Sequence, residues 1–156
     1  MPLGREYAGQ NCALARSLEV VGERWTMLIL RDLFFGVRRF GAIKAHLDIP
    51  SAALSDRLAT LVDHDILERR PYQQRPERFE YHLTERGADL YPVLAALLRW
   101  GDRWASPDGP PLRLVHRECG HDTEGQTTCP VCGVDVGPRD VRLKKGPGWR
   151  DESTSN

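Results

Sequence analysis

The sequence lacks an excess of charge of either sign, because 22 Lys and Arg residues balance 22 Asp and Glu residues. A mechanism in which the whole protein acts as a polycation on nucleic acid is therefore excluded, and any electrostatic footprint must be local. The sequence also lacks an apolar run of the roughly 20 residues that span a bilayer, and residues 1–10 lack the apolar core of a secretory signal. We therefore expect a cytoplasmic protein without a membrane segment, whose four cysteines are reduced or metal-bound.

The composition indicates one main domain and a smaller appendage. A chain of 156 residues is long enough for a domain with a real core, and a composition break at Ala105 begins a stretch rich in proline and glycine. We expect a flexible arm at 1–10, a main domain at 11–104, a linker at 105–111, a small unit at 112–136 and a disordered tail at 137–156.

The segment from Ile49 to His64 predicts the helix around which the main domain is organised. Pro50 disfavours a helical residue before it, and Ser51 can cap the free amides that follow. One face carries an apolar stripe, whereas the opposite face is small and polar near its N-terminus. A shorter helix over 39–47 and a turn precede this segment.

Two strand-like runs follow this helix, over 66–72 and 78–83. In the second run, Phe79, Tyr81 and Leu83 alternate with polar residues, which is the signal of a half-buried strand. Helix, turn, helix and hairpin are the elements of a winged helix-turn-helix in their usual order. The sequence therefore predicts a mainly α fold with a small β-hairpin wing, together with the separate unit at 112–136.

Two further helices are expected before this motif, over 11–21 and 23–35. The second is apolar on most faces, which is typical of a helix at the centre of its domain. Cys12 would lie in the first turn of the first helix, where thiols are often reactive. A cysteine that packs as a small apolar side chain at an interface is the alternative for Cys12.

Several segments resemble the HxlR-type bacterial transcription regulators. Val21–Leu33 is similar to the tryptophan-bearing segment of that family, and Cys12 lies where many members carry a cysteine. The other matching segments follow in the family's order: Arg38–Phe40, Leu54–Leu58, Tyr72–Pro76 and Tyr81–Gly87. One departure is Asp65, at a turn where the family usually has glycine, but Asp can adopt the left-handed conformation such helix ends need. Over about residues 12–104, the resemblance implies a dimeric, DNA-binding winged helix of the wider MarR-like group.

A last long helix is predicted over Thr84–Trp104, with Thr84 as its cap. Its apolar surface is wider than packing under a wing requires, which indicates a partner. The resemblance implies that the partner is a second copy, bound through this helix and the first one. A homodimer also suits DNA reading, because its two modules meet half-sites roughly 34 Å apart.

The element order also predicts which residues contact double-stranded operator DNA. The N-terminal half of the helix that begins at Ser51 should face the major groove, and arginines at the wing and before the 39–47 helix should meet phosphates or the minor groove. From 36 to 78, eight basic residues face six acidic ones, a small local excess. Asp56 is negatively charged like the phosphates, so it suits the major groove only if its carboxylate accepts a hydrogen bond from a cytosine amine. The predicted DNA contacts are Arg38, Arg39, Ser51, Ala52, Ala53, Ser55, Asp56, Arg75 and Arg78.

The small unit at 112–136 has the spacing of a zinc site. His116 and Cys119 are followed after nine residues by Cys129 and Cys132, so one imidazole and three thiolates can close a tetrahedral structural site for Zn²⁺. A segment with so few core residues needs a bound metal to stabilise its fold, and the unit is predicted to be zinc-ribbon-like. His121 is a rival fourth ligand, and a redox pair of Cys129 with Cys132 is the other interpretation. Four protein ligands leave no open position for zinc catalysis.

The favoured function is a sequence-specific DNA-binding regulator, a repressor that acts as a homodimer. The resemblance adds a possible response to oxidants or electrophiles through Cys12, since several family members sense them through a cysteine in this region. The competing class is a zinc- or thiol-dependent enzyme, or a protein-interaction module, on a winged-helix scaffold. No nucleophile, base and orienting group with recognisable spacing occurs in residues 1–104, so we predict that the protein is not an enzyme.

Overall fold

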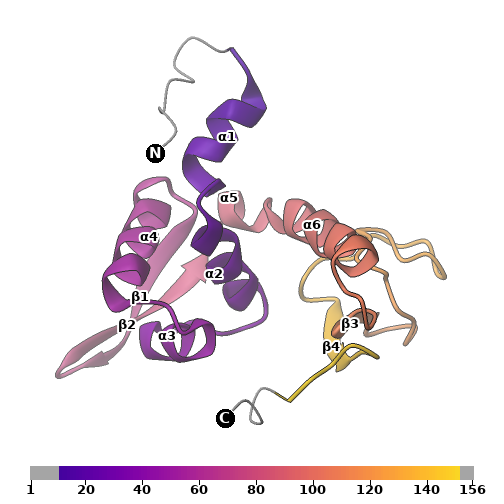
Figure 1. Cartoon of the computed structure of the whole chain (residues 1–156). Coiled ribbons are helices and arrows are strands. Elements are labelled where there is room, and N and C mark those ends of the chain that lie inside the picture. The colour runs from indigo at the N-terminus through magenta and orange to yellow at the C-terminus, as the bar shows by residue number, and fades with distance from the viewer. Residues whose placement is uncertain (1–10, 152–156) are drawn as a thin grey trace. The chain divides into compact units, whose positions relative to one another are not determined.

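The computed structural model describes residues 11–151, so the predicted arm at 1–10 and the end of the predicted tail lie outside the described residues. The chain divides into two compact units, of which the first ends at Ala88 and the second begins at Asp89. The elements, labelled in Figure 1, are α1 (Ala13–Val21), α2 (Arg24–Phe34), α3 (Phe40–Leu47), α4 (Ser51–Asp63), β1 (Leu67–Gln74), β2 (Glu77–Leu83), α5 (Glu85–Ala88), α6 (Tyr91–Trp104), β3 (Leu112–His116) and β4 (Val141–Lys145).

The core of the first unit forms around α2, as its apolar sequence predicts. Ile29 and Leu30 are fully buried there, together with Ile43 of α3. The buried carboxylate of Asp32 accepts hydrogen bonds from Arg31 at 3.1 Å and lies 2.8 Å from Nδ1 of His46 on α3. Such partners are what a buried charge requires, and this contact fixes α3 against α2.

The predicted helix, turn and second helix are present as α3 and α4. Asp48 ends α3 in the left-handed conformation, with φ of 51°, and turns the chain toward Pro50. Leu54, Leu58 and Leu61 form the buried face of α4. The predicted cap is wrong in detail: Ser51 is the first helical residue, Pro50 occupies the cap position, and no side chain caps the helix.

The predicted hairpin is present as the antiparallel pair β1–β2, which lies beside α4 (Figure 1). β1 begins one residue later and ends two residues later than the expected 66–72, and β2 begins one residue earlier than the expected 78–83. The register shifts between Pro71 and Gln73. Asp65, which precedes the hairpin, has φ of 57°. The prediction that it adopts the left-handed conformation is therefore confirmed.

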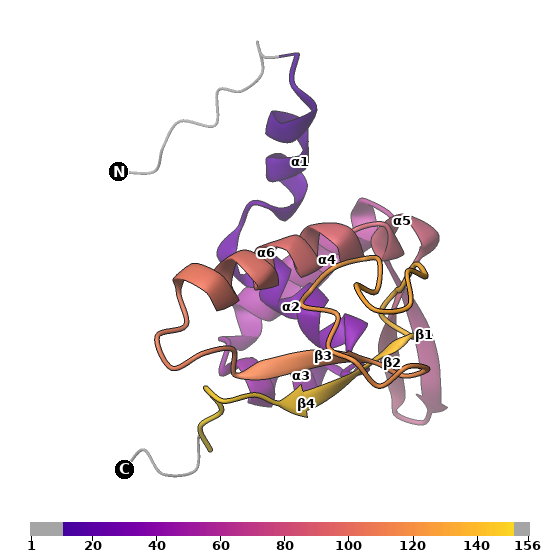
Figure 2. The ribbon, with the colours of Figure 1, turned by 90° about the vertical axis from the view of Figure 1, so that its right-hand side faces the viewer.

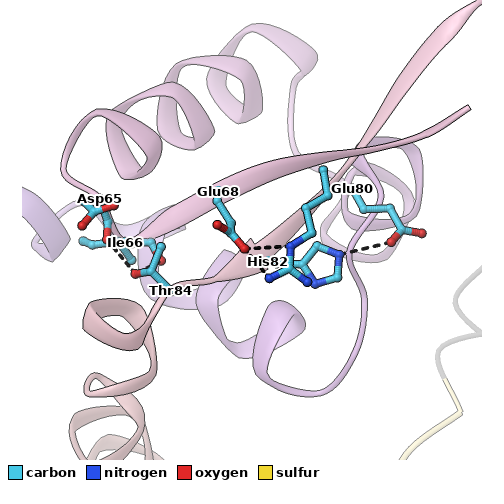
Figure 3. A network of polar contacts seen from close by, with 7 residues as sticks. Asp65, Ile66, Glu68, Glu80, His82 and Thr84 are labelled. Atoms are coloured by element: carbon cyan, nitrogen blue, oxygen red, sulfur yellow. Dashed lines mark hydrogen bonds and ion pairs between the residues drawn. The ribbon is translucent and has the colours of Figure 1, made fainter. Parts of the chain in front are cut away.

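A single helix over Thr84–Trp104 is wrong, because the segment breaks into α5 and α6. Thr84 does cap α5, since its Oγ1 accepts from the N–H of Gly87 at 3.0 Å. The same hydroxyl donates to the carbonyl of Asp65 at 2.6 Å, which ties the end of β2 to the helix end before β1 (Figure 3). α6 begins at Tyr91, and Pro92 is its second residue. Proline lacks the backbone N–H that a continuous helix needs, so it is tolerated in the first turn of a helix but not in the interior. This proline is the sequence signal for the break.

The second unit contains α6 and a small antiparallel sheet, β3–β4 (Figure 2). Its buried apolar residues are few, namely Tyr91, Leu94, Ala95, Leu114, Val115, Cys129, Val136 and Val141. Thr123, fully buried, donates from Oγ1 to the carbonyl of Leu114 at 2.9 Å and holds the central loop against β3.

The prediction of a disordered tail from residue 137 is wrong for the described part of the chain. Val141–Lys145 is strand β4, whose first residue pairs with His116 at the end of β3. Val141 is buried, so the tail completes the small unit rather than leaving it. The unit therefore extends past 136, and α6 belongs to the same compact unit, whereas the sequence groups that helix with the winged domain.

Candidate nucleic-acid interface and candidate metal site

The N-terminal half of α4 presents a small, accessible surface. Ser51, Ala52, Ser55 and Asp56 are exposed and Ala53 is half-buried, whereas the leucines of the opposite face are buried. Asp56 forms an ion pair with Arg57 within the same helix turn. This pairing places a positive charge beside the Asp56 carboxylate.

Arg39 is held against the hairpin rather than projecting alone. Its guanidinium lies 4.0 Å from the ring centroid of Tyr72 on β1, and its Nε donates to Glu80 on β2 at 3.2 Å. Cation–π stacking and the ion pair together orient the side chain. The hydrogen bond from Arg39 is the largest reason that the pKa of Glu80 lies below its ordinary value. The sequence did not reveal these partners, because they lie more than 30 residues downstream.

The other predicted DNA-contacting arginines lie on the exterior of the same unit. Arg38 is exposed, and its carbonyl accepts from the N–H of Tyr81 at 2.9 Å. Arg75 lies in the tight turn between β1 and β2, and Arg78 lies on β2 opposite Gln73. Both are exposed, so a nucleic acid could reach them without rearrangement of the core.

Ion pairs of the wing lie near its base (Figure 3). His82 Nε2 lies 3.2 Å from Glu80, and Arg70 Nε donates to Glu68 at 2.7 Å. Glu80 therefore contacts both His82 and Arg39. This network fixes the strand that carries Arg78, leaving the tip at Arg75 as the part of the wing farthest from it.

In the second unit, the structure brings together the four residues that sequence spacing selects as metal ligands. His116 Nδ1 lies 3.2 Å from Cys119 Sγ and 3.4 Å from Cys132 Sγ, and the sulfurs of Cys119 and Cys129 are 3.6 Å apart. All four ligand atoms lie within 4.8 Å of one another. Tetrahedral zinc with bonds of about 2.3 Å to sulfur and about 2.0 Å to nitrogen separates its ligands by about 3.5 to 3.8 Å. The cluster is thus compatible with a bound metal ion.

Two similar turns present the thiolates. Gly120 and Gly133 each come directly after a cysteine. Both glycines have the left-handed conformation, with φ of 75° and 72°. The N–H of Gly120 donates to the carbonyl of His116, and that of Gly133 to the carbonyl of Cys129, both at 2.9 Å. The positive φ explains why glycine occupies both positions. His116 is anchored as the last residue of β3 and is 3% exposed.

The cluster stabilises charge on one sulfur in particular. Backbone N–H groups of Cys132 and Val131 donate to Cys129 and lower the pKa of its thiol to about 6. For Cys132, donation from the N–H of Val134 lowers the pKa, but burial and the neighbouring thiols outweigh it, so that the pKa is raised. A thiolate that already accepts backbone hydrogen bonds is suited to bind a cation.

Two predicted residues lie outside the cluster. His121 is exposed and takes part through its backbone carbonyl, which accepts from the N–H of His116 at 2.8 Å. Cys12 is exposed and occupies the cap position before α1 instead of the first turn. The structure describes it as a free cysteine.

The sequence analysis did not predict a cleft of about 540 Å³ in the second unit. Residues of α6, among them Arg99, Trp100, Arg103 and Trp104, line one side, and 125–128 line the other. The four-residue spacing of the arginine pair and of the tryptophan pair was a visible signal. Nothing in the sequence placed the loop opposite them.

Comparisons with known proteins agree with this architecture. A model of the HxlR-like helix-turn-helix matches residues 20–109. An uncharacterized HTH-type transcriptional regulator of Mycobacterium tuberculosis (strain H37Rv) is 43% identical over 155 residues, which cover 99% of this chain and 97% of that protein. No helix in the described range is long and apolar enough to cross a membrane.

One solved structure extends the likeness to most of the chain. The crystal structure of PA1607, for which a transcription-factor role is proposed, is 33% identical with a TM-score of 0.69, covering 88% of this chain and 97% of that one. The redox regulator HypR in its reduced form is 28% identical with a TM-score of 0.55, covering 59% of this chain and 92% of that one. With a family model that matches more than half of its length, this chain belongs to the HxlR-like helix-turn-helix family of transcriptional regulators.

Proposed function

We propose that this protein is a homodimeric, sequence-specific DNA-binding repressor. The observation that carries the proposal is α4, whose leucine face is buried while its N-terminal half is small, polar and exposed. A helix of this kind can enter the major groove, where base edges are read. Membership of a regulator family supports the same function.

The proposed contacts divide into two classes. Ser51, Ala52, Ala53, Ser55 and Asp56 face bases or the adjoining sugar and phosphate, whereas Arg38, Arg39, Arg75 and Arg78 supply positive charge to phosphates or the minor groove. The contact of Arg39 with Tyr72 and Glu80 supports this division, because it pre-orients one guanidinium beside the wing. Pre-orientation reduces the entropy lost on binding.

A gel-shift titration tests the proposal directly. Labelled DNA from upstream of the protein's own gene should shift at lower protein concentration than a shuffled duplex of equal length and composition. A promoter-reporter assay should show lower expression with the protein than without it. Equal affinity for the two duplexes would contradict sequence-specific binding, and higher expression would contradict repression.

We further propose that the homodimer forms through α1 and α6. Both helices present large apolar side chains to solvent in a single chain: Leu14 and Leu18 on α1, and Val93, Leu97, Trp100 and Trp104 on α6, with exposed fractions from 46% to 67%. Apolar surface of this extent marks an interface. Sedimentation should give twice the chain mass, and Leu97→Asp should give the monomer mass. Monomeric wild-type protein would contradict this assembly.

We infer that the cluster of His116, Cys119, Cys129 and Cys132 binds one structural Zn²⁺ per chain. Three thiols and an imidazole at tetrahedral spacing support zinc over harder cations, which prefer oxygen ligands. Elemental analysis of protein purified without added metal should find about one zinc per chain. Near-zero zinc with three free thiols would contradict the site, and a Cys129–Cys132 disulfide would instead favour a redox pair.

Cys12 is proposed as the residue through which oxidants or electrophiles alter DNA binding. Its thiol is exposed next to α1, a proposed dimer helix, and HypR, a structural neighbour, is a redox regulator. Alkylation, or oxidation to a disulfide with the second copy, would shift the two reading helices relative to each other. Cys12→Ser should keep DNA binding but abolish its response to diamide. An intact response in the variant would exclude Cys12.

We propose that the chain acts by binding rather than by catalysis. The relatives and structural neighbours are described as regulators or transcription factors. In the zinc unit, four protein ligands would leave no coordination position for a substrate.

A further inference from the structure

The cleft of about 540 Å³ in the second unit has the size of a small-molecule site. One wall is α6 and the other is the loop 125–128, which directly precedes the predicted ligand Cys129. The cleft lies within one compact unit, so its shape does not depend on how the two units sit relative to each other.

The loop wall is held firmly by its own hydrogen bonds. The N–H of Gln126 donates to the carbonyl of Thr123 at 2.9 Å, and the carbonyl of Thr127 accepts from the N–H of Val136 at 2.8 Å. Thr128 Oγ1 donates to Asp135 at 3.1 Å. These contacts tie the loop to Thr123, Asp135 and Val136 of the same unit and hold this wall of the cleft in place.

Gly125 sets the separation of the two walls. A Cβ atom at this position would lie 3.1 Å from the carbonyl oxygen of Ala95, on α6, and 3.2 Å from Cβ of Arg99. Gly125 also has φ of 70°, a conformation in which side chains are strained. The loop therefore closes on the helix at Gly125 and leaves the space beyond it open.

The side chains that line the cleft combine positive charge with aromatic surface. Arg99 and Arg103 lie one turn apart on α6, and none of the lining residues is acidic. Trp100 and Trp104 are also one turn apart and are 61% and 66% exposed. The guanidinium of Arg103 lies 4.9 Å from the ring centroid of Trp104, so charge and aromatic face are already adjacent.

This chemistry selects one class of ligand. A carboxylate matches the planar, forked donors of arginine, and an aromatic ring matches the exposed indoles. We propose that the cleft is an effector site for planar aromatic monocarboxylates, with Arg99 and Arg103 binding the carboxylate and Trp100 and Trp104 the ring. Hydroxyls of Thr127 and Thr128 border the same space.

The position of the site allows a bound ligand to affect DNA binding through the dimer. This step rests on the proposed function as a dimeric regulator. Trp100 and Trp104 belong both to the cleft and to the exposed apolar face of α6 that contains Val93 and Leu97. A ligand that stacks on these indoles changes the surface offered to the second copy. Ligand binding and dimer geometry would therefore be coupled.

The test measures binding to the full-length chain without DNA, so its result is independent of whether the protein binds an operator. Titration calorimetry with 2-naphthoate should show saturable binding, about tenfold tighter than the neutral 2-naphthamide of the same shape. Cyclohexanecarboxylate, which has the charge without the aromatic ring, should also bind more weakly. No binding of 2-naphthoate at millimolar concentration, or equal affinity for the amide, would overturn the proposal.

Variants assign the binding to the cleft. The double variant Arg99→Gln with Arg103→Gln should weaken 2-naphthoate about tenfold or more, because both charged donors are lost. Arg142→Gln, on β4 outside the cleft, removes one charge from the same unit and should leave the affinity unchanged. Unchanged affinity in the double variant would overturn the site. Both arginines of the pair are exposed, and circular dichroism would verify that the variants remain folded.

Discussion

The two units of this chain obtain their stability in different ways. The first has a core of large aliphatic side chains, with Ile29, Leu30, Leu54, Leu58 and Leu61 at most 1% exposed. The second buries fewer large side chains, and its interior includes His116, Thr123 and Cys129. The first unit thus has an aliphatic core, whereas the interior of the smaller unit combines apolar side chains with polar side chains and the cluster of candidate metal ligands. We therefore expect that the second unit can unfold while the first stays folded.

The largest expected effect comes from removing the metal ligands of the second unit. Cys129→Ser should unfold the second unit, because structural zinc supplies about 10 to 16 kcal/mol in comparably small domains. Hydrogen exchange should show lost protection in β3 and β4 and retained protection in α2 and α4. Cys12→Ser, a cysteine substitution outside the cluster, is the matched control and should change neither. Retained protection of β3 and β4 in Cys129→Ser would show that the unit folds without metal.

A core substitution in the first unit should produce the opposite pattern. Leu58, 1% exposed on α4, leaves a cavity when replaced by alanine, and we expect a loss of about 2 to 5 kcal/mol in unfolding free energy. Urea denaturation followed by circular dichroism measures this change. Zinc content should stay the same, since the ligands belong to the other unit. The exposed Leu112→Ala serves as the control, and a similar loss there would argue against a cavity effect.

The contrast also explains what the sequence predicted and what it missed. Helical spacing of apolar residues located α4, because that pattern reflects burial of one helix face. Alternation of apolar and polar residues located β2, although the residues from Phe79 to Leu83 are all half-buried. The ligand set was predicted by spacing alone, since both turns are local. Strand β4 was mistaken for a tail because its first residue, Val141, pairs with His116, 25 residues earlier, and the cleft likewise needs distant segments brought together. The predicted DNA contacts and the role of Cys12 remain predictions.

The wing arginines should affect DNA binding without affecting either core. Replacing Arg39 or Arg75 by glutamine should weaken binding to all sequences alike and reduce the slope of log affinity against log salt by about one unit each. Fluorescence anisotropy from low to high salt measures the slope. Arg117→Gln, in the second unit, should leave it unchanged. An unchanged slope for Arg39→Gln or Arg75→Gln would remove that residue from the phosphate contacts.

Acid should loosen the anchor of Arg39. The pKa of Glu80 is lowered in the folded state, chiefly by the hydrogen bond from Arg39. The stabilisation is therefore present above the ordinary value of 4.5 and is lost as the pH falls through the lowered pKa. NMR titration of Glu80 should show that pKa, and Arg39→Gln should raise it toward the ordinary value. A Glu80 pKa at or above 4.5 in the unsubstituted protein would contradict the anchor.

The smallest expected effect is a gain in stability of the first unit at Asp65. This residue has φ of 57° between α4 and β1, where any side chain carries strain that glycine avoids. The backbone carbonyl of Asp65, which accepts from Thr84, is retained in any substitution at this site. Asp65→Gly should therefore raise the unfolding free energy by about 0.5 to 1 kcal/mol, even after the greater flexibility of glycine in the unfolded chain is included. Asp65→Ala keeps a Cβ atom and should lower the unfolding free energy by a similar amount, because alanine adopts positive φ less readily than Asp. If both substitutions shift the urea midpoint in the same direction, backbone strain does not govern this turn.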